Sequence, residues 1–270
     1  MSMKKNYVVE TIRKAQMVQM LAAGKRMDDR AFDQHRELKI ETGVIPKANG
    51  SARVFLGNTQ VIAGVKIATG IPFPDTPDKG ILMVNAEILP LSSPFAEPGP
   101  PSEEAIELAR VVDRGIRESK MVDLGKLNLV SGKTVIAVFV DCNIMNVDGN
   151  LFDATSYAVV AALRTATMKK YVVKDDKAVA TDQLVPVPVE KTPVSVTFAR
   201  IGDRVVVDPN TEEEASMDMR ITITTEDGGN VCASQKGEAD SITPAQVLQA
   251  VDTSIRLGKE IRAKIIEATK

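Results

Sequence analysis

The 270-residue sequence has no tryptophan, a single histidine and two cysteines. Aromatic residues make up only 4% of the chain, so few rings are available for a platform on which nucleic-acid bases could stack. Because His35 is the only histidine, a Ser-His-Asp triad or a histidine-based metal site would depend on that residue alone. His35 lies in a polar stretch, residues 32–36, between an expected helix and an expected strand, and we predict a solvated loop side chain.

The two cysteines, Cys142 and Cys232, lie far apart in the sequence and match no metal-ligand spacing. Cys142 follows Asp141 and has no histidine nearby in the sequence that could activate it. Two buried, unpaired thiols are typical of a reducing compartment, and we predict a cytoplasmic location. The sequence predicts no metal site and no cofactor.

Long apolar runs are also missing. No stretch of ~18 apolar residues occurs, so we expect no membrane span and no membrane partner. The N-terminus reads Met-Ser-Met-Lys-Lys-Asn and is not followed by an apolar run, which argues against a signal peptide.

Strong net charge is absent as well, because 34 basic residues face 36 acidic ones and the formal net charge is −2. Proteins that hold nucleic acid through their overall charge are usually basic. Any contact with nucleic acid must therefore come from a local basic cluster. The 44% of hydrophobic residues is enough for a sizeable core in one large or two small domains.

Periodicity and breakers indicate strands followed by helices in each half of the chain. Helices are expected at 6–23, 102–120 and 151–169, strands at 37–45, 81–89 and 133–140, and hairpins at 52–68, 194–207 and 219–235. Proline-rich connectors are expected at 71–79 and 90–101. A capping box at Thr243–Gln246 predicts a long last helix.

These elements predict an α+β chain of two similar lobes with packed helices. We expect an N-terminal helix and arm at 1–30, a first lobe at 31–170 and a second lobe at 194–270. The polar segment between the lobes contains prolines at 186, 188 and 193, and we interpret 171–193 as a linker.

Three arginines, Arg110, Arg114 and Arg117, recur at spacing i, i+4, i+7 in the expected helix 102–120. This spacing places all three guanidinium groups on one helix face, where planar forks suit phosphate oxygens. A solvated face whose arginines pair with Glu107, Asp113 and Glu118 would give the same pattern, so the residues alone leave both interpretations open.

A glycine-containing turn, Asp148-Gly149-Asn150, leads directly into the next expected helix. Such a helix N-terminus can hold a phosphate on backbone N–H groups. However, Leu151 and Phe152 supply no cation, and Asp153 would repel an anion. The local chemistry therefore argues against a working phosphate site.

An acidic run at 208–214, followed by Asp218, could bind Mg²⁺ or act in acid–base chemistry, but acidic loops are more often merely solvated. No second carboxylate cluster supports a site, and no Walker A or Rossmann glycine motif is present. From its residues alone, the chain is a two-lobed α+β protein with no convincing catalytic set.

Several of these segments together resemble the RNase PH family. The matching segments are 24–30, which resembles the family's R-x-D-G-R stretch with Asp29 in place of the usual glycine; 50–62, its first hairpin; 107–117, its arginine helix; 148–150, its D-G-G turn; and 208–219, in its second half. They occur in the family order over roughly residues 20–260. The resemblance implies the RNase PH-like fold, also described as ribosomal protein S5 domain 2-like, with mixed sheets.

The departures from the family pattern bear on function. Phosphorolytic members bind the attacking phosphate with a Thr/Ser-Arg pair, whereas the chain has Leu151 and Phe152 after Asn150, which implies a degenerate phosphate site. Active members also place an aspartate shortly before an Asp-Met pair. Here Glu212 and Glu214 fill that stretch and Asp218 remains, which implies a degenerate acidic site.

This pattern resembles the non-catalytic RNase PH-like subunits of archaeal exosomes. The resemblance implies a heterodimer with a catalytic homologue, three such heterodimers in a hexameric ring, RNA-binding cap subunits and single-stranded RNA as a partner. It also implies that Arg110, Arg114 and Arg117 bind RNA, the first two across the dimer interface. Two alternatives remain open: an active phosphorolytic exoribonuclease with an unrecognised phosphate site, and a purely structural scaffold.

Overall fold

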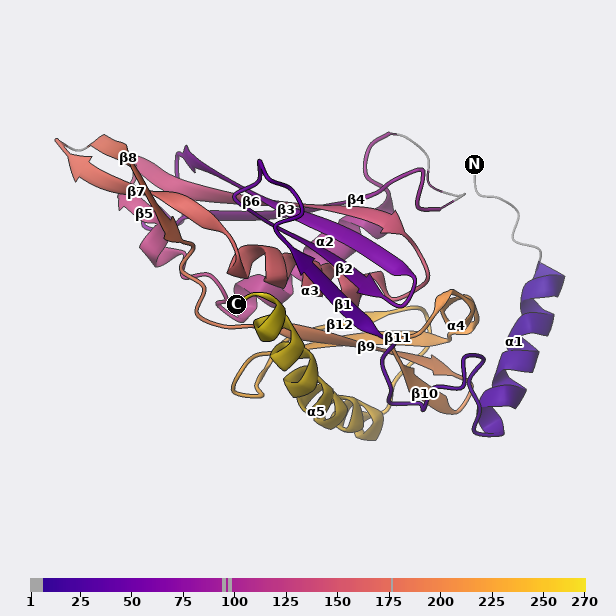
Figure 1. The fold of residues 1–270 in the computed structure, drawn as a ribbon. Coiled ribbons are helices and arrows are strands. Elements are labelled where there is room, and N and C mark those ends of the chain that lie inside the picture. The colour runs from indigo at the N-terminus through magenta and orange to yellow at the C-terminus, as the bar shows by residue number, and fades with distance from the viewer. Residues whose placement is uncertain (1–6, 94–95, 97–98, 176) are drawn as a thin grey trace.

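The computed structural model describes residues 7–93, 96, 99–175 and 177–270 (Figure 1). Residues 1–6, and parts of the expected connector 90–101, lie outside these described residues. The α+β class with two main sheets and packed helices is confirmed. No helix among the described residues is long and apolar enough to cross a membrane.

The first sheet has the strand order β1-β2-β3-β6-β4, with the short β5 paired to β6. The strands are β1 (Leu38–Thr42), β2 (Gly50–Leu56), β3 (Thr59–Gly70), β4 (Ile81–Ile88), β5 (Asn128–Val130) and β6 (Thr134–Asn146). All pairs are antiparallel except β4 with β6, which is parallel, so this sheet is mixed. The expected hairpin at 52–68 is the β2–β3 pair.

The second sheet is antiparallel throughout and has the order β10-β9-β11-β12. Its strands are β9 (Val194–Ile201), β10 (Arg204–Val207), β11 (Met219–Thr225) and β12 (Val231–Gly237). The two hairpins predicted in the second half are therefore confirmed, because their tight turns carry local glycine signals that sequence reasoning recognises.

Helix α3 (Leu151–Arg164) lies between the two sheets and is buried from Phe152 to Leu163. Toward the second sheet, the Tyr157 hydroxyl donates to the Ser195 carbonyl oxygen at 2.8 Å. Toward the first sheet, Gly50 allows close approach, because a Cβ there would lie 2.4 Å from the Ala162 carbonyl oxygen. One hydrophobic core consequently runs from the first sheet through α3 to the second.

The remaining helices cover the outside of this core. They are α1 (Tyr7–Ala22), α2 (Glu103–Glu118), the 3-10 turn η1 (Gly125–Leu127), α4 (Thr211–Ser216) and α5 (Pro244–Ala268). Helix α5 begins at the predicted capping box and packs Leu257, Ile261 and Ile265 into the core. Helix α1 packs Met17 and Leu21 against a separate small cluster at the end of the second sheet (Figure 1).

The prediction of a linker over 171–193 was wrong for most of that segment. Strands β7 (Thr167–Lys174) and β8 (Lys177–Pro186) form an antiparallel hairpin, and α3 ends at Arg164 rather than at residue 169. Both faces of this hairpin are largely exposed, so polar and apolar residues do not alternate as they do in a half-buried strand. Its polar composition was therefore mistaken for irregular structure.

Candidate functional site

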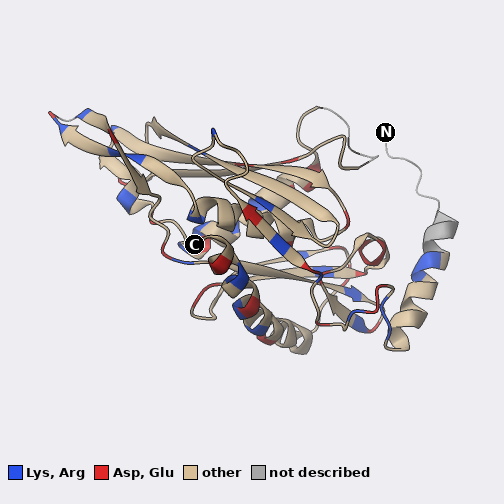
Figure 2. Ribbon diagram, in the orientation of Figure 1, with Lys and Arg blue, Asp and Glu red and all other residues tan. Residues whose placement is uncertain are grey.

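Helix α2 carries the three predicted arginines on its solvent face. Ser102 caps the helix by accepting a hydrogen bond from the Ala105 backbone N–H, and Leu108, Val112 and Ile116 are buried on the opposite face. This division leaves the side chains of Arg110, Arg114 and Arg117 exposed on one side. Along α5, by contrast, basic and acidic positions alternate (Figure 2).

The three arginines are not equivalent. Arg117 pairs with Asp113, with 2.7 Å between Nη2 and Oδ1, and its Nη2 also donates to the Leu82 carbonyl oxygen at 2.8 Å. Within the described part of the chain, Arg110 and Arg114 have no hydrogen bond or ion pair. Two guanidinium groups are therefore free to meet an anion from outside, whereas Arg117 is held by its own helix and by β4.

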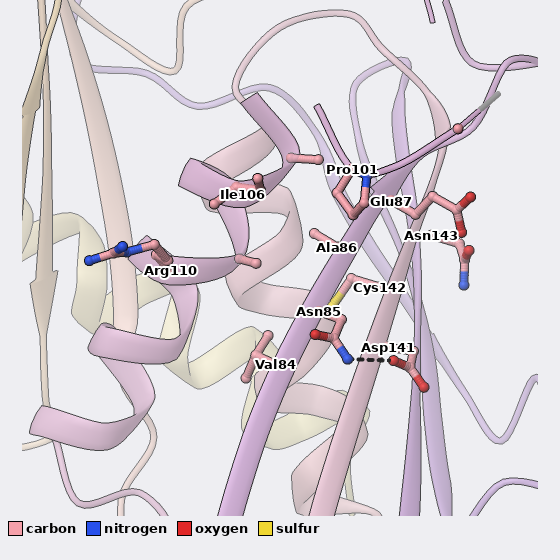
Figure 3. Close-up of a pocket in the computed structure, with 13 residues that line it drawn as sticks. Val84, Asn85, Ala86, Glu87, Pro101, Ile106, Arg110, Asp141, Cys142 and Asn143 are labelled. Carbon is pink, nitrogen blue, oxygen red and sulfur yellow. Dashed lines mark hydrogen bonds between the residues drawn. The ribbon is translucent and has the colours of Figure 1, made fainter. Parts of the chain in front are cut away.

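A groove lies between α2 and the strands β4 and β6 (Figure 3). Its volume is about 600 Å³, and Arg110 lies on its α2 side with the side chain pointing away from the strands. On the strand side, Asn85 donates a hydrogen bond to Asp141 at 3.1 Å. An adjoining groove of about 490 Å³ is lined by Arg110, Arg114 and Arg117, so the arginine face borders a continuous recess.

The predicted phosphate-binding turn is occupied by the chain itself. Asn150 adopts a left-handed conformation, with φ of 51°, and caps α3. Its backbone N–H, which would otherwise be available to an anion, donates to Oε1 of Glu214 at 2.8 Å. Burial raises the pKa of the Glu214 carboxyl to about 7, although the Asn150 N–H and the charge of Arg220 favour its ionised form.

Phe152, which we expect at the position of a phosphate-binding arginine in phosphorolytic relatives, is buried. Its ring lies beneath the Arg220 guanidinium, with 4.2 Å between the guanidinium carbon and the ring centroid. Arg220 is already paired with Glu107, at 2.7 Å between Nη2 and Oε1. Leu151 packs against the core. The turn therefore presents apolar side chains to an anion, and the nearby cation, Arg220, is already paired with Glu107.

The three acidic residues predicted from the second half each contact a different group. Glu212 is exposed and lies 3.8 Å from Arg13, Glu214 contacts the start of α3, and Asp218 pairs with Lys14 and accepts from the Gly202 N–H at 2.7 Å. Each of the three carboxyl groups therefore has a different partner, and their assignment to a degenerate acidic site stays a prediction. In the described residues, no group of three or more potential metal ligands is present.

Sequence reasoning missed a buried network of charges at the start of the second sheet. Arg26 and Glu213 are fully buried and form a bidentate pair at 2.8 and 2.6 Å. Asp208 accepts hydrogen bonds from Arg30 and Arg36. Burial opposes ionisation of Asp208, but the hydrogen bonds and charge of Arg36 outweigh it and lower the pKa of this carboxyl to about 2.

This network fixes segment 26–36 against the body of the protein, and it explains why the prediction for His35 was wrong. The His35 side chain is only 11% exposed, and its Nε2 lies 3.6 Å from Oδ2 of the buried Asp153. Asp153 is itself satisfied by the backbone N–H and the hydroxyl of Thr197. His35 is therefore a largely buried neighbour of a structural carboxylate and not a solvated loop residue.

The cysteines give no sign of reactivity. Cys142 is buried, and burial raises the pKa of its thiol far above the ordinary range. Cys232 is only partly buried, which corrects the expectation of two buried thiols, and burial raises its pKa to about 11. Neither thiol is poised to act as a nucleophile.

Comparison with known families matches both halves of the chain. Residues 34–169 match the model of the 3′ exoribonuclease family, domain 1, and residues 191–256 match the model of the same family's domain 2.

Curated relatives match over nearly their full length. The exosome complex component Rrp42 of Thermococcus gammatolerans is 47% identical over 263 residues, covering 97% of this chain and 96% of that protein. The protein of the same name from Thermoplasma acidophilum is 49% identical over 257 residues, covering 95% of this chain and 96% of that protein.

Solved structures give the same picture. A chain from the Archaeoglobus fulgidus exosome with RNA bound to the active site is 43% identical, with a TM-score of 0.87, and the match covers 95% of this chain and 99% of that one. A chain of an archaeal exosome core is 40% identical, with a TM-score of 0.83, and the match covers 96% of this chain and 98% of that one.

Proposed function

The chain belongs to the 3′ exoribonuclease family, and from this membership we propose that it is a non-catalytic, RNase PH-like subunit of an archaeal-type exosome. In this role it joins a catalytic homologue in a heterodimer, three heterodimers form a hexameric ring, and RNA-binding cap subunits complete the assembly. The full-length match to proteins named as exosome components supports the proposal. The unpaired cysteines agree with a cytoplasmic location.

The observation that carries the proposal of catalytic silence is the contact between Asn150 and Glu214. A phosphorolytic site must bind an inorganic phosphate dianion and present it to the RNA 3′ end. Here an acidic side chain already accepts the N–H at the start of α3, and Phe152 supplies an apolar surface beside it. Placing a phosphate among these groups without a free cation would cost several kcal/mol.

The subunit's contribution to RNA binding is assigned to Arg110 and Arg114, with Arg117 in a supporting position. The first two are exposed and have no partner among the residues that the structure describes, so they can reach phosphates of an RNA strand held by the neighbouring subunit. Phosphate contacts of this kind fix the position of the strand without reading its bases. Correct placement of the 3′ end in turn accelerates the partner's reaction.

The test is release of nucleoside diphosphates from a 3′-tailed RNA in phosphate buffer. Three samples are compared: this chain alone, its catalytic homologue alone and the two reconstituted together. We expect no release from this chain alone, and more release from the reconstituted ring than from the homologue alone. Release by this chain alone would establish the rival function of an active phosphorolytic enzyme and would overturn the proposal.

A purely structural scaffold is the second rival. It predicts that substitution of Arg110 and Arg114 by glutamate leaves the activity of the assembled ring unchanged. Our proposal predicts loss of RNA binding and activity while the ring still assembles, as judged by its size in solution.

A further inference from the structure

Strand β4 forms an open edge of the first sheet. It pairs with β6 on one side, and no described strand pairs with it on the other. Natural edge strands are usually protected by lysine, proline or a bulge. The eight residues Ile81–Ile88 contain neither lysine nor proline, and their register with β6 is regular. Of the usual forms of protection, this edge has only the charge of Glu87 and a contact from α2 at Leu82.

The contact of Arg117 identifies which backbone groups face the open edge. Its guanidinium donates to the Leu82 carbonyl oxygen, so Leu82 directs its backbone polar groups away from β6. In a parallel strand, alternate residues direct their N–H and C=O to the same side. Val84 and Ala86 therefore also present their backbone groups to the open edge, where no described backbone group meets them.

The space beside this edge is open. Val84 and Ala86 line the 600 Å³ groove against α2 (Figure 3), and Leu82 and Val84 line the adjoining 490 Å³ groove. Exposed apolar side chains flank it: Phe73 is 51% exposed and Ile106 is 49% exposed. An apolar border around unpaired backbone donors and acceptors suits an extended peptide strand.

A protein strand fits this edge better than RNA does. RNA phosphates only accept hydrogen bonds, whereas the edge alternates N–H donors with carbonyl acceptors. The acidic side chains of Glu87 and Asp141 also line the wider groove and would repel a phosphate backbone. RNA is therefore assigned to the arginine face and a peptide strand to the β4 edge.

We propose that an extended strand of the catalytic homologue pairs with the open edge of β4, through the backbone groups of Val84 and Ala86. The partner is identified by position, because Arg110 and Arg114 line the same grooves and are the residues assigned to reach that subunit's RNA. The inference thus rests on the proposed function. It adds the means by which the two subunits join: a continuous sheet across their interface.

Amide hydrogen exchange tests this pairing without mutation. It is measured residue by residue for β4 in the isolated full chain and in the complex with the homologue, with and without a single-stranded RNA. In the isolated chain, the amides of Val84 and Ala86 should exchange faster than those of Met83 and Asn85, which face β6. In the complex, exchange at Val84 and Ala86 should slow at least tenfold.

Two variants at one position provide a second measurement. Val84→Pro removes the edge-facing N–H but no bond to β6, and Val84→Ala removes valine packing while keeping the N–H. We expect Val84→Pro to weaken binding of the homologue at least tenfold relative to Val84→Ala. Equal binding by the two variants would overturn the pairing. Circular dichroism of each isolated variant establishes that it is folded.

The possible results separate this inference from the proposed function. An active complex whose Val84 and Ala86 amides remain unprotected would overturn strand pairing while leaving the exosome role intact. Protection that appears in the isolated chain only on adding RNA, or only at high chain concentration, would assign the edge to RNA or to a second copy and would also overturn it. Failure to form any complex would contradict the proposed function itself.

Discussion

The carboxyl group of Glu214 accepts a hydrogen bond from the backbone N–H of Asn150, at 2.8 Å, at the start of α3. This contact places an acidic side chain of the second half where a helix N-terminus of the first half would otherwise bind an external anion. Burial raises the pKa of this carboxyl to about 7 against the opposing effect of the Asn150 N–H, so the buried position of Glu214 makes stability depend on pH.

Glu214→Gln should remove that pH dependence. Between its ordinary pKa of 4.5 and the folded value of about 7, the folded chain retains a proton that the unfolded chain releases. The free energy of unfolding should therefore fall as pH rises through this window, by on the order of 3 kcal/mol. Urea unfolding of both proteins at intervals from pH 5 to pH 8 measures the difference.

Asp208 provides an internal check on this assignment. The pKa of its carboxyl is lowered from 3.8 to about 2. The stability that Asp208 contributes is therefore fully present above pH 3.8 and is lost as the pH falls toward 2. Its effect lies outside the Glu214 window and has the opposite slope. Parallel stability curves for the wild type and Glu214→Gln between pH 5 and pH 8 would contradict the assignment to Glu214.

The arginines of α2 should separate into two classes in RNA binding. Arg110→Ala/Arg114→Ala removes two unpaired cations, so the affinity of the reconstituted ring for single-stranded RNA should fall roughly 10- to 100-fold. The slope of log affinity against log salt concentration should decrease by about 1.4, because each phosphate contact on a single strand contributes about 0.7. Fluorescence anisotropy across a salt series measures both quantities.

Arg117→Ala is the matched control on the same helix face. Arg117 is already paired with Asp113 and the Leu82 carbonyl. Its removal should therefore change the slope of log affinity against log salt concentration by less than half of the roughly 0.7 expected for one phosphate contact. If Arg117→Ala reduced the slope as much as the double substitution, the distinction between free and paired arginines would be wrong.

Local signals allowed much of the fold to be predicted from the sequence. The capping box at Thr243 and the glycine turn at Gly202 each act within a few residues. Each is visible in a short stretch of sequence because the partner atoms are neighbours along the chain. Helix ends and hairpins governed by such contacts were placed close to their observed positions.

Features that depend on distant contacts could not be predicted in this way. Arg26 and Glu213 are 187 positions apart, and neither position shows a local pattern that indicates burial. Phe152 was recognised as the wrong residue for a phosphate site, but its packing under Arg220 was not foreseeable. The likeness to a family indicated which turn to inspect, whereas only the structure revealed that Glu214 fills it.

The buried pair of Arg26 and Glu213 should be a major source of stability in its context. Arg26→Met leaves a fully buried carboxylate without its partner, and we expect unfolding free energy to fall by about 3–5 kcal/mol. Arg26→Met/Glu213→Gln removes both charges while preserving the N-terminal cap of α4, so it should recover part of this loss. Urea unfolding at neutral pH gives the values for a double-mutant cycle.

Arg13→Met supplies the exposed comparison. Arg13 and Glu212 are separated by 3.8 Å and both side chains are about half exposed or more, so this substitution should cost less than about 1 kcal/mol. Equal losses from Arg13→Met and Arg26→Met would show that burial of the Arg26 pair does not determine its effect.

Phe152→Arg tests whether one residue can give the turn at the start of α3 the phosphorolytic activity that we propose it lacks. The substitution supplies the cation that the family resemblance implies for phosphorolytic members, but the new guanidinium would enter a buried position beside Arg220, whose guanidinium carbon lies 4.2 Å from the Phe152 ring centroid. Like charges and lost apolar burial should lower the unfolding free energy by about 3–5 kcal/mol. The isolated variant should still release no nucleoside diphosphate from RNA, because Glu214 continues to hold the Asn150 N–H.

Phe152→Leu distinguishes the loss of the ring from the added charge. It keeps the site apolar and removes the contact with Arg220, so we expect a loss of about 1–2 kcal/mol and no change in RNA binding by the reconstituted ring. Thermal unfolding and phosphate-dependent nucleotide release are measured on both variants. Nucleotide release by isolated Phe152→Arg would mean that the missing cation alone silences the chain. If Phe152→Arg were as stable as Phe152→Leu, a second positive charge beside the Arg220 guanidinium would carry no cost in stability.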